Sequence, residues 1–210
     1  MAADPNTLVA HNNVPGAVNH RRQLVSTEKH YFTFSKELIN FQINSEEFCV
    51  VIKVDTWRDS AEWQYLFHVE SNGNCFVIAK SPTMSDGMGG KIFFKVIINS
   101  EIQLEGESES RPRFDKEIYL LIGKKKGSSW LGCWAYEKPV DLSFLPVGNI
   151  VIGSGRELFK KGFAKDGFIG CCNGESYFCT LKLVYFVMSK KYLLVEYQDN
   201  AFQSGDMKIQ

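Results

Sequence analysis

The chain has 210 residues, of which 44% are hydrophobic and 23% charged, enough for one domain with a substantial core. Its 24 Lys and Arg residues equal its 24 Asp and Glu residues, so no net charge draws the whole molecule to nucleic acid or to an anionic membrane. No apolar run approaches the length of a transmembrane helix, so we expect no membrane insertion. Sixteen Phe, eight Tyr and four Trp favour β-strands, because aromatic side chains suit a pleated, half-buried surface.

The first part of the chain, residues 1–28, predicts a flexible arm, because it is polar, rich in Asn and without periodicity. It shows no basic region followed by an apolar stretch, so no secretory signal is predicted. We therefore expect a cytoplasmic protein if the sequence is complete, and an extracellular or virion-associated one if it is a domain excised from a larger protein. At the other end, residues 198–210 have a similar composition and predict a flexible tail.

Residues 29–197 predict a single β-sandwich domain, since short apolar strands alternate with turn residues. Apolar side chains recur at every second position over residues 31–43 and predict a strand there, and a more continuously apolar strand is expected at 48–54. Two hairpins are predicted at Ser71–Asn74 and at Asn99–Ser100, because Asn and Gly accept positive φ.

The second half continues the same pattern. Two more strands are expected on either side of a turn rich in Lys, Gly and Ser at 124–129, and NIVI at 149–152 predicts another. A final strand is expected at 192–197. Helical spacing is weak everywhere, and one helical turn is predicted at 156–161.

The stretch GFIGCCNGESYFCTLKLVYFVMS begins at Gly167 and holds three of the six cysteines. Asn173 and Gly174 predict a turn, and alternate residues from Tyr177 to Val187 predict one continuous apolar face of a long strand. We interpret this stretch as the hairpin that closes the sandwich.

The order of these features resembles the concanavalin A-like superfamily, and within it the laminin-G-like and pentraxin-like domains. The segment FDKEIYLLIGKKKGSSWLGCWAYEKPVD resembles their paired central strands, and PVGNIVIGSG resembles their short glycine-hydrophobic-glycine strand. The segment KDGFIGCCNGESYFCTLKLVYFVMSK resembles their last core strands, and YFTFSKELINFQINSEEFCVVIKVDTW resembles their first long strands. The resemblance implies an all-β fold, a two-sheet antiparallel β-sandwich of the jelly-roll type. It also implies recognition of glycans or proteins, often through loops at one rim.

The cysteines decide whether a metal or redox centre is expected; they are Cys49, Cys75, Cys133, Cys171, Cys172 and Cys179. A structural zinc site usually needs two pairs of ligands at short spacing, and no C-x-x-C occurs, so we predict no metal and no cofactor. Disulfides are an alternative because six is an even number, although the missing secretory signal disfavours them. The favoured interpretation is that free cysteines act as small buried hydrophobes.

An acidic row in LEGESESR places Glu105, Glu107 and Glu109 on one face of a predicted strand. Two carboxyl groups at such spacing are what a retaining glycosidase needs. This stretch lacks the central Asp and the aromatic neighbours of the E-x-D-x-x-E pattern of such enzymes, and we interpret it as a solvated edge.

Candidate ligand-binding residues lie near predicted turns, where exposed aromatic rings can stack on sugars and amides or carboxylates can bind hydroxyls. They are Trp57, Trp63, Asn72, Asp86 and Trp130. For the tryptophans the alternative is that they fill the core, and for the glycine-rich segment around Asp86 we favour a mobile rim loop.

These observations predict a recognition module rather than an enzyme. We expect this module to bind glycans as a lectin does, through rim loops or a sheet face. The alternative is a structural or protein-interaction domain of a virion or larger assembly, and a homo-oligomer is compatible with the sequence. A glycoside hydrolase that uses Glu105 and Glu107 is the third and weakest hypothesis.

Overall fold

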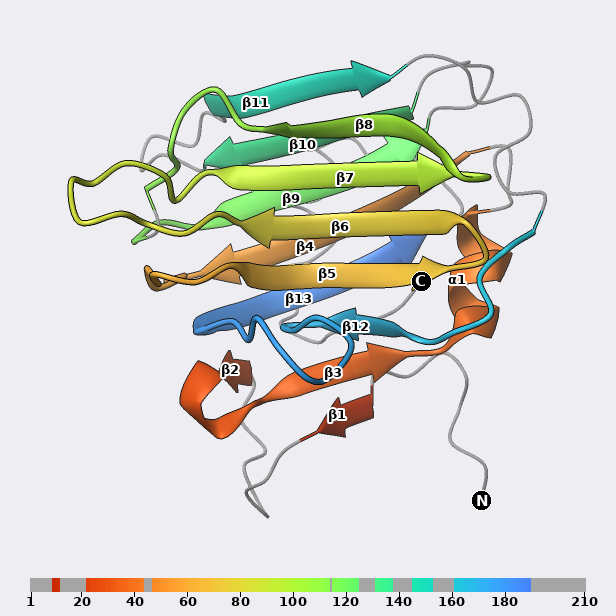
Figure 1. The fold of residues 1–210 in the computed structure, drawn as a ribbon, viewed down its shortest axis with the longest axis horizontal. Coiled ribbons are helices and arrows are strands. Elements are labelled where there is room, and N and C mark those ends of the chain that lie inside the picture. Colours follow the sequence, from red (N-terminus) through yellow and green to blue (C-terminus); the bar gives the residue numbers. More distant parts are fainter. Residues whose placement is uncertain are drawn as a thin grey trace.

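The computed structural model describes residues 9–11, 22–43, 47–113, 115–124, 131–137, 145–152 and 161–189. Within these residues the chain forms two antiparallel sheets packed face to face, the seven-stranded one in front of the six-stranded one in Figure 1. The predicted two-sheet antiparallel sandwich is therefore confirmed.

Seven strands form one sheet, in the spatial order β1 (Val9–His11), β3 (Tyr31–Phe34), β12 (Gly167–Ile169), β5 (Gln64–Ser71), β6 (Asn74–Lys80), β7 (Ile92–Ile98) and β8 (Glu101–Glu107). Six strands form the other, in the order β11 (Leu145–Ile152), β10 (Leu131–Glu137), β9 (Ile118–Lys124), β4 (Phe48–Asp55), β13 (Leu181–Ser189) and β2 (Arg22–Leu24). β1 and β2 fall within the predicted arm, and each pairs with a longer strand of one sheet.

The inward faces of both sheets form one apolar core, which follows from the alternation of side chains along each strand. The ring of Phe34 on β3 stacks on Phe67 of β5 at 5.4 Å and meets Phe186 of β13 at the same centroid distance. Gly167 is required beneath this ring, because a Cβ atom there would lie 1.9 Å from Cζ of Phe34. Aromatic stacking thus joins the two sheets around β12.

Both predicted hairpins are confirmed. Ser71 pairs with Asn74 across the β5–β6 turn, whose central residues Asn72 and Gly73 have φ of 55° and 76°. The β7–β8 turn has positive φ at Asn99 and Ser100. The hairpin strands β9 and β10 also pair as predicted, whereas the turn between them, the final predicted strand and the residues of the predicted helical turn before Lys161 lie outside the described residues.

The strand predicted over residues 31–43 is wrong in its second half, which forms helix α1 (Lys36–Ile43) after a short 3-10 turn, η1 (Ser26–Glu28), and β3. Ser35 caps the helix, since its side-chain oxygen accepts a hydrogen bond from the amide of Leu38 at 3.2 Å. Leu38, Ile39 and Ile43 are buried, which is the spacing of a helix face rather than of a strand.

The continuous strand face predicted from Tyr177 to Val187 is also wrong. β13 begins at Leu181, and a β-bulge between Leu183 and Tyr185 shifts the register of the strand. Among the side chains that the structure describes after Leu183, Phe186 and Met188 are the buried ones. The predicted turn at Asn173–Gly174 is present, but the segment is a crossover from β12 in one sheet to β13 in the other, not a hairpin.

All six cysteines are free thiols, and five of them are buried, as the sequence predicted. Burial raises the pKa of Cys75 and of Cys171 to about 12, because a thiolate is poorly solvated in these positions. Cys172 is the half-buried member of the set. The five buried cysteines therefore serve as core residues.

Candidate binding site at the loop end

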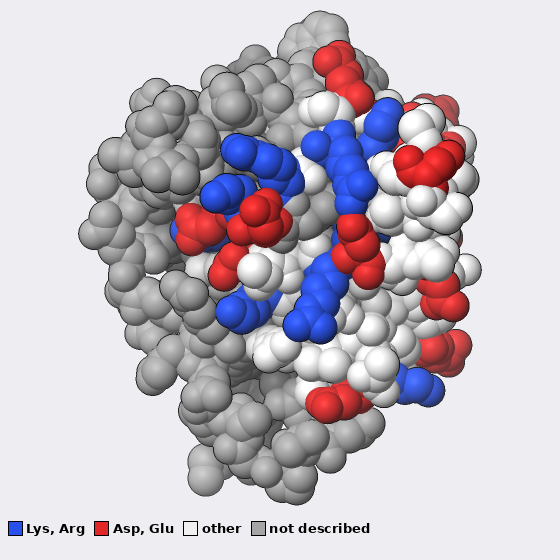
Figure 2. All heavy atoms as spheres, turned by 90° about the vertical axis from the view of Figure 1, so that its left-hand side faces the viewer, with Lys and Arg blue, Asp and Glu red and all other residues white. Residues whose placement is uncertain are grey.

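The loops that join β4 to β5, β6 to β7 and β8 to β9 meet at one end of the sandwich, on the left in Figure 1. The start of β13 lies at the same end. Basic and acidic side chains are interspersed over this surface (Figure 2). We refer to it as the loop end.

The β4–β5 loop, residues 56–63, is held to its neighbours by backbone hydrogen bonds. The amide of Arg58 donates to the carbonyl of Thr180 at 2.8 Å, and the amide of Thr83 donates to the carbonyl of Ser60 at 2.8 Å. Lys80 at the end of β6 donates from Nζ to the carbonyl of Arg58. These contacts tie the loop to both sheets.

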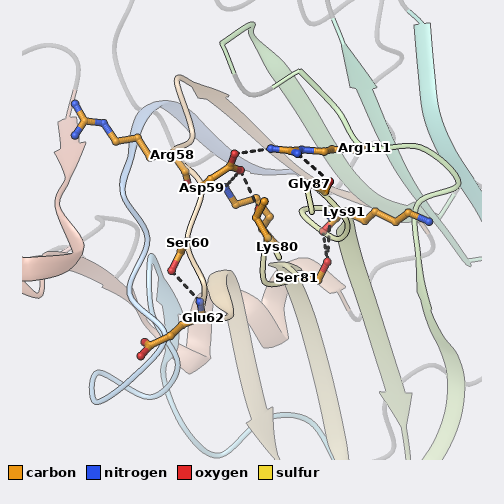
Figure 3. A network of polar contacts seen from close by, with 10 residues as sticks. Arg58, Asp59, Ser60, Glu62, Lys80, Ser81, Gly87, Lys91 and Arg111 are labelled. Carbon is orange, nitrogen blue, oxygen red and sulfur yellow. Dashed lines mark hydrogen bonds and ion pairs between the residues drawn. The ribbon is translucent and has the colours of Figure 1, made fainter. Parts of the chain in front are cut away.

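Asp59 lies at the centre of a polar network on this loop (Figure 3). Its Oδ2 accepts a hydrogen bond from Arg111, and its Oδ1 accepts one from the Thr83 hydroxyl at 3.1 Å and lies 3.4 Å from Nζ of Lys80. Arg111 also donates to the carbonyl of Gly87 at 3.3 Å. The network therefore joins all three loops.

Partial burial alone would raise the pKa of Asp59, but Lys80, the Thr83 hydroxyl and Arg111 together lower it below its ordinary value. The carboxylate is thus ionised and engaged by two cations. The role of Asp59 is therefore to hold the three loops together rather than to bind a ligand.

Lys80 is the buried charge beneath the loop, with a side chain that is 0% exposed. Burial lowers its pKa to about 8, and Asp59 offsets part of this effect. Its Nζ also lies 5.4 Å from the centre of the Trp57 ring, a cation–π distance. The ammonium therefore links the Trp57 ring in the core to the polar network around Asp59.

A hollow of about 430 Å³ opens beside this network, between the β4–β5 loop, β2 and the start of β13. Its polar lining consists of Gln23, Thr56, Arg58, Asp59, Asp115, Thr180 and Lys182. Positively charged, negatively charged and neutral hydrogen-bonding side chains thus line the same hollow. Such a lining can hydrogen-bond a ligand rich in hydroxyl groups.

The five predicted site residues do not form one site. Trp57 lines the hollow but is only 1% exposed, and its ring belongs to the core, so it offers no stacking face. Asp86 is exposed at the tip of the β6–β7 loop, where Oδ1 accepts a hydrogen bond from the amide of Met88 at 2.9 Å. Asn72 lies in the β5–β6 turn at the opposite end, and Trp130 lies outside the described residues.

Trp63, the last residue of the β4–β5 loop, packs on the outer face of the seven-stranded sheet. Its ring lies 5.2 Å from that of Phe93 and 6.5 Å from that of Tyr65. Tyr177 stacks on Tyr65 at 5.2 Å, is 42% exposed and has a φ of 55°. This loop therefore separates Trp57, which faces the core, from Trp63, which faces an aromatic strip.

Asn72 lines a second hollow of about 500 Å³ at the opposite end from the loop end. Its neighbours there include Glu70, Ser100, Lys165 and Asn173. Because it lies at the other end of the sandwich, this hollow is a suitable control surface for binding experiments.

Sequence reasoning missed Arg58, Lys80, Arg111 and Lys182. Lys80 carried a usable signal, because Phe76 and Ile78 precede it at alternate positions of one strand and place it on the inward face. Arg111 carried none because its partner Asp59 lies on another loop, and Lys182 carried none because most of the residues that share the hollow with it lie on other elements. The polar network could not be read from the spacing of any one motif.

Glu105 and Glu107 lie exposed on the same face of the outermost strand β8, and Glu105 pairs with Lys95 at 3.2 Å. In the part of the chain that the structure describes, no group of three His, Cys, Asp or Glu side chains could hold a metal ion. Within the same residues, no helix is long and apolar enough to cross a membrane.

Known proteins share the architecture but not the sequence. No family model matches the chain, and no curated protein matches it in sequence. CBM40 of the Ruminococcus gnavus IT-sialidase, bound to α2,3-sialyllactose, superimposes with a TM-score of 0.50 at 12% identity, over 75% of this chain and 83% of that one.

Two further structures are longer than this chain. The binding domain of botulinum neurotoxin DC, in complex with SialylT, matches with a TM-score of 0.54 at 9% identity, over 95% of this chain and 47% of that one. The enzymatically active domain of bacteriophage CBA120 tailspike protein 2 matches with a TM-score of 0.51 at 13% identity, over 97% and 30%. The chain spans less than half of these two proteins. At these identities the likeness concerns the fold alone, and that fold is the two-sheet antiparallel sandwich of the jelly-roll type predicted from the sequence.

Proposed function

We propose that the protein is a non-catalytic recognition module that binds glycans in the hollow at the loop end. The observation that carries this proposal is the hollow itself, where Thr56, Gln23 and Asp115 offer hydrogen-bonding groups beside two cations. Sugar hydroxyls both donate and accept hydrogen bonds, so a lining of mixed polarity suits them. The loops around the hollow are fixed by the Asp59 network, which limits the conformational entropy lost on binding.

Two of the structural neighbours support this proposal at the level of the fold. The Ruminococcus module was determined with a sialylated sugar, and the neurotoxin domain with SialylT. The same neurotoxin domain was also determined with rat synaptotagmin II, so a protein ligand is the alternative occupant.

The proposal excludes hydrolysis as the main activity. Glu105 and Glu107 face solvent on the edge of a sheet, and neither lines the hollow. A glycosidase would need two carboxyl groups on either side of a bound sugar bond. Incubation of the protein with each glycan that it binds, followed by detection of new reducing ends, should show no product. Product formation that disappears in Glu105→Gln would contradict the proposal.

The binding test compares two matched pairs of substitutions. Gln23→Ala with Asp115→Ala removes polar groups from the hollow, and Ser100→Ala with Lys165→Ala does the same in the opposite hollow. A glycan array identifies ligands, and isothermal titration then measures their affinity. We expect the first double variant to bind about tenfold or more weakly and the second to bind as the wild type does.

Equal loss in both double variants, or loss only in the second, would move the site away from the loop end. Binding to no glycan on the array would overturn the proposed function and favour a protein ligand.

A further inference from the structure

We propose that the hollow at the loop end selects acidic glycans, with Arg58 and Lys182 binding the anionic group of the sugar. This inference rests on the proposed function and names the class of glycan. The anionic group is a carboxylate or a sulfate, since both offer several oxygen acceptors to a guanidinium and an ammonium.

The first reason is the way in which Arg58 is presented. Its amide is bound by the carbonyl of Thr180, and its carbonyl is bound by the ammonium of Lys80, so the backbone is fixed on both sides. The side chain is exposed, and Figure 3 shows it extending away from Asp59. A cation on a fixed backbone loses less entropy when it binds a ligand than one on a free loop.

The second reason is the state of the two cations. Among the residues that the structure describes, neither the guanidinium of Arg58 nor the ammonium of Lys182 has an ion-pair or hydrogen-bond partner. Both line the hollow. Their donors are therefore available to a ligand.

The third reason is that the nearest carboxylate is already occupied. Asp59 is engaged by Arg111 and Lys80, which leaves Asp115 as the other acidic residue of the lining. Asp55 stands opposite Lys182 in the register between β4 and β13, and it has an interaction partner of its own. With Asp59 neutralised by its own cations, Arg58 and Lys182 exceed the remaining negative charge of the lining by one.

These charges suggest which residues of the hollow bind the anionic group and which bind the hydroxyl groups of the sugar. The planar guanidinium of Arg58 can bind two oxygens of one carboxylate or sulfate, and Lys182 adds a second positive charge. Asp115, Thr56 and Gln23 are then placed to bind the hydroxyl groups of the same sugar. The sugar that fits this lining carries one negative group and several neutral hydroxyls.

The experiment uses glycans in matched sets, each consisting of a neutral glycan, its sialylated derivative and its sulfated derivative. Affinities are measured by isothermal titration for the wild type, Arg58→Ala, Lys182→Ala and the control Lys91→Ala. Lys91 lies at the same end but outside the hollow, and Figure 3 shows it pointing away from Asp59. The control removes the same charge from the same end of the molecule.

We expect the wild type to prefer an acidic member over its neutral parent by at least about tenfold, and this preference to weaken with rising salt. Arg58→Ala and Lys182→Ala should each remove most of the preference while leaving the neutral glycan bound with unchanged affinity. Lys91→Ala should keep the preference. The sialylated and sulfated arms show which anion the pair of cations favours.

Equal binding of neutral and acidic members would overturn the inference and leave the proposed function intact. An acidic preference that survives both substitutions, or falls equally in Lys91→Ala, would also overturn it. Binding to no member of any set would overturn both.

Discussion

Lys80 shows how one side chain organises the loop end. Its stem follows the inward face of β6, and its ammonium reaches the Arg58 carbonyl, the Asp59 carboxylate and the Trp57 ring at the rim of the core. A buried ammonium without such partners would be strongly destabilising. Burial lowers the pKa of Lys80 to about 8, and Asp59 offsets part of this effect, so the ammonium stays protonated at neutral pH.

The lowered pKa of Lys80 predicts a pH dependence of stability. Between about pH 8 and pH 10.5 the unfolded chain holds a proton on Lys80 that the folded chain has released, so folding becomes more favourable as pH rises. The free energy of unfolding of the wild type relative to Lys80→Met should therefore rise through this window, by about 3 kcal/mol at most. Urea unfolding at several pH values measures it.

The comparison with Lys80→Met matters because buried thiols titrate in the same range. Burial raises the pKa of Cys75 and Cys171, so their contribution to stability falls above about pH 9, but it does so equally in both proteins. A relative stability that stays flat or falls from pH 8 to pH 10.5 would show that Lys80 is not buried as described.

At the scale of elements, α1 shows why part of the fold could not be predicted. Residues 31–43 carry apolar side chains at alternate positions, as a strand does, and Ile39 and Ile43 fit this alternation. Leu38 is also buried, although it falls between the alternate positions. Apart from the Ser35 cap, the contacts that hold the helix come from residues far away in sequence. The Asp166 carboxylate accepts from the amide of Lys36 at 3.0 Å, and Asn40 exchanges two hydrogen bonds with the backbone of Phe163.

The short strand β12 gives a sharper prediction about packing between elements. Gly167→Ala should destabilise the protein by about 1–3 kcal/mol, because its Cβ would overlap the Phe34 ring, which is itself packed between two other aromatic rings. Thermal unfolding measures the loss.

The control is the double variant Gly167→Ala with Phe34→Leu. A leucine lacks the ring atoms that the new methyl group would meet, so the two substitutions should cost less together than the sum of their separate costs. Strictly additive costs would contradict the described packing of β12 on β3.

At the scale of the whole molecule, the sequence was sufficient for the architecture and insufficient for the site. Turn residues such as Asn72 and Gly73, and apolar alternation on strands such as β7, are local signals, so the two-sheet sandwich could be predicted. The hollow joins Gln23, Arg58, Asp115 and Lys182, which come together only through the sheet topology. Trp57 was a misleading candidate, because its ring is buried in the core and ring size favours burial as strongly as it favours sugar stacking.

The packing of the whole core predicts the reactivity of the thiols. In the native protein Cys172, the half-buried thiol, should react with Ellman's reagent before the five buried thiols do, although burial raises its pKa, and all six should react after unfolding without reductant. Cys172→Ser should abolish the fast native reaction. Several fast thiols in the native state, or fewer than six after unfolding, would contradict the described burial or the free state of the cysteines.

If the loop end is the recognition surface of this sandwich, amide chemical-shift mapping with a glycan selected from the array should show it. We expect the largest shifts on titration at Thr56 to Asp59, at Asp115 and at Thr180 to Lys182. Shifts concentrated instead around Asn72 and Lys165, or over the aromatic strip of Trp63, Tyr65 and Tyr177, would contradict it.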